Sequence, residues 1–182
     1  MDTRSYDPGT WNVVAVAENG MTGAALRGLS QLASFRTTPY RGVLVGNTDG
    51  DASAWLLDSR ARRPEAFAEV NRVVPLEHTL AFERDDVTEA LCDSLEGAGG
   101  RLEGKSFHVR ARLRGLKGRL ETQAVERALG GFLYERAADS GRAPTVSFDD
   151  PDVVVMVQVL GVQVGYVFLD RRLRELDLVR PR

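Results

Sequence analysis

The residues best suited to chemistry lie between Lys105 and Arg119, where positive charge is concentrated. Six of these fifteen residues are lysine or arginine, and none is acidic. Guanidinium and ammonium groups donate charge-assisted hydrogen bonds to phosphate oxygens. Like charges on one strand face repel each other unless an anion lies across them. The stretch therefore predicts a surface that binds a phosphate backbone.

Apolar and polar side chains alternate from Phe107 to Arg114, and a period of two predicts a strand with one buried face and one face in solvent. The solvent face is expected to carry four residues: His108, Arg110, Arg112 and Arg114. Gly115 and Gly118 then form a turn before a helix, whose first N–H groups favour an anion. One alternative stays open, because charged strand faces are often only solvated edges that prevent aggregation.

Other groups that could form a catalytic or metal site are sparse. Asp149, Asp150 and Asp152 lie close together, but in a proline turn without a nearby histidine, which favours a turn that positions the next strand. Cys92 is the only cysteine, which excludes an intrachain disulfide and a cysteine-rich zinc site. An enzymatic site would need His108, Cys92 or these carboxylates, and their spacing supports none. We therefore expect no catalytic residue, no metal, no cofactor and no enzyme activity.

The composition is that of an ordinary globular protein. The chain has 182 residues, 43% of them hydrophobic and 27% charged, with a net charge of −2. Because the chain is not basic overall, any nucleic-acid binding must come from local clustering of charge. The lone cysteine, the polar start and the absence of a long apolar run predict a cytoplasmic protein with no membrane partner.

The first half is expected to follow the order β-α-β-β-α-β, which is typical of a ferredoxin-like domain. Its expected elements are strands over 11–17, 34–38, 43–45 and 72–76, and helices over 21–33 and 52–70, the second one broken near Pro64.

In the second half, residues 77–84 are expected to form a connection. The expected elements that follow are a helix over 86–95, the basic strand, a helix over 120–138, a short extended segment over 145–148, and a hairpin of strands over 153–160 and 162–169.

In this combination the chain resembles a THUMP domain that follows a small ferredoxin-like domain. The opening Trp11-Asn12-Val13-Val14 is similar to that of the stand-alone THUMP proteins that bind tRNA. The residues that carry the THUMP resemblance are Lys105-Ser106-Phe107, Val109, Arg112, Arg114-Gly115, Glu121, Val125-Glu126, Val146, Phe148, Pro151-Asp152-Val153-Val154-Val155 and Arg180-Pro181.

The resemblance implies an α+β chain with a leader over 1–10, a ferredoxin-like domain over 11–78 and an α/β THUMP domain over 79–182. It implies a non-catalytic adaptor that presents tRNA to a separate modification enzyme, in the first place a cytidine acetyltransferase. The alternatives are an RNA-binding subunit for methylation or thiolation, or an interaction module without RNA. The implied RNA contacts are Lys105, His108, Arg110, Arg112, Arg114, Gly115, Lys117, Gly118 and Arg119.

Overall fold

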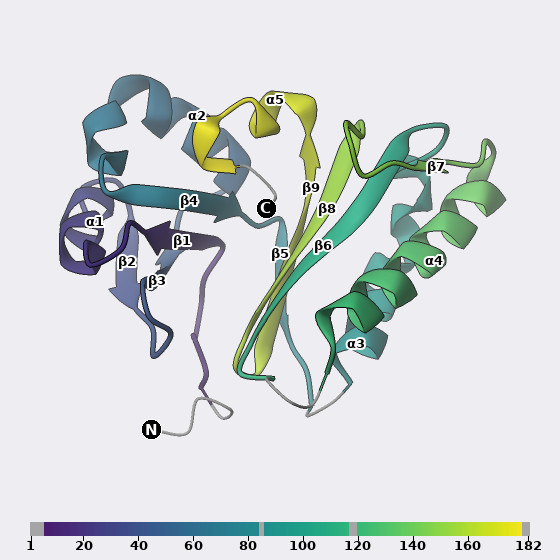
Figure 1. The fold of residues 1–182 in the computed structure, drawn as a ribbon, viewed down its shortest axis with the longest axis horizontal. Helices are drawn as coiled ribbons and strands as arrows, with labels where there is room; N and C mark the ends of the chain where they lie inside the picture. Colours follow the sequence, from purple (N-terminus) through teal and green to yellow (C-terminus); the bar gives the residue numbers. More distant parts are fainter. Residues whose placement is uncertain (1–5, 84–85, 117–119, 180–182) are drawn as a thin grey trace.

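A computed structural model describes residues 6–83, 86–116 and 120–179. The chain forms two β-sheets that pack side by side, with helices on the outer side of each (Figure 1). The described part contains five α-helices. The expected mixture of helices and strands in two sheets is therefore confirmed.

The first sheet has four antiparallel strands in the order β2-β3-β1-β4. The elements follow one another as β-α-β-β-α-β, as the sequence predicted, with a short 3-10 helix before the last strand. Their bounds are β1 Val13–Ala17, α1 Thr22–Leu29, β2 Ser34–Thr37, β3 Val43–Asn47, α2 Ala52–Arg62, η2 Pro64–Phe67 and β4 Val70–Pro75.

The second sheet has five strands in the order β5-β9-β8-β6-β7. Strand β6 pairs in parallel with both of its neighbours, whereas β9 is antiparallel to β8 and β5. The elements are β5 His78–Ala81, α3 Val87–Leu95, η3 Glu96–Arg101, β6 Ser106–Arg114, α4 Thr122–Ser140, β7 Thr145–Val146, β8 Val153–Leu160, β9 Gln163–Asp170, α5 Arg171–Arg174 and η4 Asp177–Val179.

Strand β8 shows why the two sheets belong together. All eight of its residues are buried, and its sequence is apolar except for Gln158. Val155 and Val157 pack in one hydrophobic core with α3 and α4, while Met156 and Leu160 pack in another with the first sheet. A strand covered on both faces needs a continuous apolar run rather than alternation.

The sequence did not predict η3, β5, α5 or η4. The expected connection over 77–84 contains β5, which pairs with β9 at the edge of the sheet. After β9, the chain turns into α5 and η4, and η4 packs against β4 of the first sheet. Among the described helices, none combines the length and the apolar character that a membrane crossing needs.

Candidate nucleic-acid interface

The basic strand β6 lies in the second sheet, and the face that was expected to be in solvent looks toward the first sheet. Phe107, Val109 and Ala111 pack against α3 and α4, as the alternation predicted. The opposite face of the sheet looks toward the first sheet, because Met156 and Leu160, which are register partners of Arg110 and Arg114, belong to the core shared with that sheet. The polar face of β6 is therefore partly covered by protein.

The expectation that this whole face is in solvent is wrong, most clearly at His108. Its side chain is only 5% exposed, and its ring stacks on Phe148 at 5.3 Å between centroids. The ring Nδ1 lies 2.7 Å from the carbonyl oxygen of Ser147. Burial lowers the pKa of His108, since an imidazolium loses hydration there, and the nearby Arg110 and Arg174 act in the same direction. A neutral imidazole donating to Ser147 is the form that this environment favours.

Arg110 and Arg112 lie on the same face and are partly exposed. The Arg110 guanidinium is 4.0 Å from the Glu126 carboxylate, at the limit of an ion pair, and its Nε has no hydrogen-bond partner among the described residues. Within the described residues, Arg112 donates only to the carbonyl of its neighbour Ala111, at 3.2 Å. These two guanidiniums therefore keep most of their donors for another molecule.

Arg114 is the most buried of the three arginines. It donates to Oε1 of Gln158 at 2.8 Å, and among the residues that the structure describes no carboxylate contacts it. Burial, and after it the positive charges of Arg112 and Arg72, lower the pKa of Arg114 to about 10. At neutral pH the guanidinium still carries its charge, held among other cations.

The remaining predicted contacts divide into two groups. Lys105 is exposed and donates to the carbonyl of Arg101 at 2.9 Å, one turn before the strand. Gly115 follows β6 with φ of +97°, a backbone conformation that favours glycine. Lys117, Gly118 and Arg119 lie outside the described residues, so their contribution stays a prediction.

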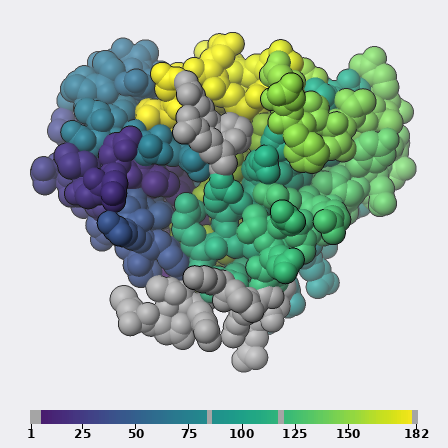
Figure 2. Space-filling model, in the orientation of Figure 1, coloured from purple at the N-terminus to yellow at the C-terminus, as the bar shows by residue number. Residues whose placement is uncertain are grey.

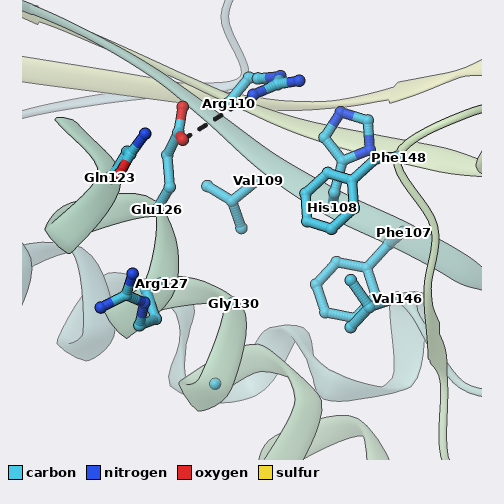
Figure 3. A pocket seen from close by; sticks show the side chains of 11 residues that line it. Phe107, His108, Val109, Arg110, Gln123, Glu126, Arg127, Gly130, Val146 and Phe148 are labelled. Atoms are coloured by element: carbon cyan, nitrogen blue, oxygen red, sulfur yellow. Dashed lines mark ion pairs between the residues drawn. The ribbon is translucent and has the colours of Figure 1, made fainter.

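A pocket opens at the edge of β6, where β7 ends after only two residues (Figure 3). It has a volume of about 410 Å³ and lies between β6, the first half of α4 and the segment that follows β7. Gly130 and Gly131 have no side chain, which leaves room for the pocket on this side of α4. Its lining residues are Phe107, His108, Val109, Arg110, Gln123, Glu126, Arg127, Gly130, Gly131, Val146 and Phe148.

Glu126 has a structural role in this pocket as well as a charge. Its Oε1 accepts a hydrogen bond from the backbone N–H of Ala111 at 2.9 Å. Because β7 is too short to reach that position, the N–H would otherwise be without a strand partner. The same carboxylate is the one that Arg110 approaches, as the dashed line in Figure 3 shows.

The pocket adds residues that the sequence did not mark as binding residues. Val146 is 55% exposed and Phe148 is 67% exposed, although both are large and apolar. Gln123 and Arg127 supply polar groups from α4. The available signal was an aromatic residue shortly before the turn at Pro151, but the sequence pattern alone assigned Phe148 to a short extended segment.

The carboxylates in the turn between β7 and β8 hold the backbone in place. The Asp152 carboxylate accepts hydrogen bonds from the N–H and the hydroxyl of Ser106, at 2.9 and 2.8 Å. These two bonds lower the pKa of Asp152, and the positive charge of Arg171 contributes. Arg171 also contacts Asp150 at 3.3 Å. This agrees with the interpretation of these residues as a turn that positions β8.

Comparison with known proteins finds a relative in sequence. A tRNA sulfurtransferase from Erwinia tasmaniensis is 33% identical over 102 residues, which are 54% of this chain and 20% of the relative. The match thus spans about a fifth of the sulfurtransferase. No family model matches the chain.

Two solved structures show the same fold across most of the chain. TrmN from Thermus thermophilus has a TM-score of 0.60 at 21% identity, over 87% of this chain and 45% of TrmN. A 4-thiouridine synthetase in complex with RNA and ATP has a TM-score of 0.58 at 12% identity, over 88% of this chain and 41% of that protein. At such low identity these similarities establish the fold alone.

These comparisons correct one prediction. We expected a chain without enzyme activity, whereas its relative in sequence is an enzyme that is named for sulfur transfer to tRNA. Over about half of its length the chain is therefore similar to part of an enzyme that acts on tRNA, and the expectation of a non-enzyme is not kept.

Proposed function

We propose that this chain binds tRNA as the RNA-binding part of a tRNA-modifying enzyme. The observation that carries the proposal is the row of arginines on β6 beside a half-open pocket with an exposed aromatic ring. Alternate residues of a strand are about 6.6 Å apart, so Arg110, Arg112 and Arg114 form an evenly spaced row of cations along the strand. Such a row suits the repeating negative charge of a single RNA strand.

The pocket gives this row a place for an unpaired base. Phe148 offers a ring on which a base can stack, and Arg127, Gln123 and Glu126 offer polar groups for its edge. Duplex RNA presents mainly shape and phosphate, whereas bases in single strands are open to stacking. The site therefore fits the phosphates and an exposed base of one unpaired RNA segment.

The sequence relative supports sulfur transfer as the modification that this RNA binding serves. This chemistry replaces the cytidine acetylation that we first expected. We also propose that the fold divides into a ferredoxin-like domain over 11–78 and a THUMP domain over 79–182. The strand order of the first sheet and the start of the second sheet at His78 support that division. A cytoplasmic location stays a prediction.

The proposal is tested by fluorescence anisotropy with labelled tRNA and with a duplex DNA of similar length, at about 50 mM salt. We expect binding to tRNA that is at least about tenfold tighter than binding to the duplex. Equal affinity for both nucleic acids, or no binding to tRNA, would contradict the proposal. The variant R62Q is the matched control, because Arg62 lies on α2 with an exposed side chain paired to Asp58.

A further inference from the structure

Arginines from both sheets lie at the boundary between them, which we call the seam: Arg72 comes from β4 of the first sheet, and Arg112 and Arg114 come from β6 of the second. Strand neighbours place Phe35 and Val13 on the same face as Gly46, and Phe35 packs against Trp55 of α2. That face of the first sheet is the one that helices cover. Arg72 is the register partner of Val16, which is three residues from Val13 on β1. Because side chains alternate between the two faces of a strand, Val16 and Arg72 lie on the face opposite to Val13.

The opposite face of the first sheet is the one turned toward the second sheet. Val14 and Val74, which share this face with Arg72, are buried in the same core as Met156 and Leu160 of β8. Arg114 is the register partner of Leu160 on the second sheet. Arg72 and Arg114 therefore approach the same seam from opposite layers.

The seam stays open to solvent at these residues. Arg72, Arg112 and Arg114 are all partly exposed rather than fully buried. Figure 2 shows the teal part of the chain that contains β6 reaching the surface of the near face, between the purple and blue first sheet and the green α4. A ligand that follows β6 can therefore reach the seam.

The electrostatics of the seam favour an anion. The charge of Arg72 acts on Arg114 directly, since it contributes to the lowered pKa of Arg114 after burial and Arg112. The side-chain partner of Arg114 is the uncharged amide of Gln158, which is itself 2% exposed. Among the residues that the structure describes no carboxylate contacts Arg114, so its largely buried charge favours an anion placed beside it.

We propose that Arg72 and Arg114 bind the same phosphate group from opposite sides of the seam. The inference rests on the proposed RNA binding and extends it, because it makes the first sheet part of the binding site. The phosphate would belong to the RNA backbone and would follow, along the strand, the phosphates bound by Arg110 and Arg112. Binding at this point joins the two sheets through the ligand.

The test is a double-mutant cycle on tRNA affinity with R72Q, R114Q and the double variant R72Q/R114Q, with R62Q as the control. We expect R72Q to weaken binding by about fivefold or more, while R72K, which keeps the charge, loses less. If both arginines hold one phosphate, the loss in the double variant is smaller than the product of the single losses by at least about twofold. Circular dichroism of each variant checks that the fold is kept.

The outcomes separate this inference from the function on which it rests. If R112Q weakens tRNA binding but R72Q binds as tightly as R62Q, the shared phosphate site is wrong and the RNA function stands. If the wild-type protein does not bind tRNA, both fail. Thermal melting at constant ionic strength distinguishes the two sources of the phosphate. If inorganic phosphate raises the melting temperature of the wild type but not that of R72Q, the site binds the isolated group. If tRNA alone raises the melting temperature, the site requires the RNA chain.

Discussion

Replacing Arg112 by glutamine should change how strongly tRNA binding depends on salt. Arg112 is the best position for this test. In the part of the chain that the structure describes, its guanidinium donates only to the neighbouring carbonyl of Ala111, so its loss should leave the fold unchanged. On single-stranded RNA, each neutralised phosphate contributes a slope of about −0.7 in a plot of log affinity against log salt. The three arginines of β6 therefore predict a slope of about −2 from this strand alone.

This slope gives a measurable change in affinity. Between about 50 and 200 mM salt, a slope of about −2 lowers the affinity roughly 20-fold, and removal of one contact reduces the loss to roughly sevenfold. Anisotropy titrations with labelled tRNA at four salt concentrations measure both slopes. R62Q removes one exposed positive charge on α2 and should keep the wild-type slope. A slope in R112Q equal to that in R62Q would refute the assignment of Arg112 to a phosphate.

Three further predictions concern the pocket, the turn after β7 and the packing of η3. F148A should weaken tRNA binding by about 5- to 150-fold, the range for loss of one base–aromatic stack. Its thermal stability should fall only slightly, because Phe148 is 67% exposed and loses chiefly its contact with His108. Y134A, on α4, is the control, and equal effects of the two variants on tRNA binding would contradict the stacking role. D152N should lower the urea midpoint at pH 7. Because folding lowers the pKa of the Asp152 carboxyl, the stabilisation by its carboxylate is present above the pKa of the unfolded chain and is lost as the pH falls through the pKa of the folded protein. The difference in urea midpoint between D152N and the wild type should therefore shrink below about pH 4, and a difference independent of pH would contradict this role. G99A should destabilise the protein by about 1–3 kcal/mol, since a Cβ there would lie 2.3 Å from the carbonyl oxygen of Arg136 on α4. G100A is the control, because a Cβ at Gly100 meets nothing within 4 Å. Equal urea midpoints of the two variants would contradict the close packing of η3 on α4.

The sequence predicted the strand β6 and its row of arginines, because a period of two is a local property of the chain. It did not predict that the first sheet covers the polar face, since the layer opposite a strand is set by distant residues. The continuous apolar run of β8 held that information indirectly. His108 is the register partner of Val154, which is buried in the core that includes the first sheet, so this part of the polar face is covered.

The elements that escaped prediction are short or lack a periodic signal. Strand β5 has four residues and only partial burial, so its pairing with β9 gives it order that its own sequence does not indicate. Helix α5 also has four residues, and Asp170 caps it through a hydrogen bond to the N–H of Leu173. The pocket depends on where β7 ends relative to α4, which is a tertiary relation between segments far apart in the sequence.

The most direct measurement for RNA binding on β6 is ultraviolet crosslinking of the wild-type protein to tRNA, followed by mass spectrometry of the crosslinked peptides. We expect crosslinks in the peptides that contain Phe107 to Arg114 and Val146 to Phe148, which line the pocket and the arginine row. Crosslinks confined to α1 and α2, on the far side of the first sheet, would contradict the placement of the RNA.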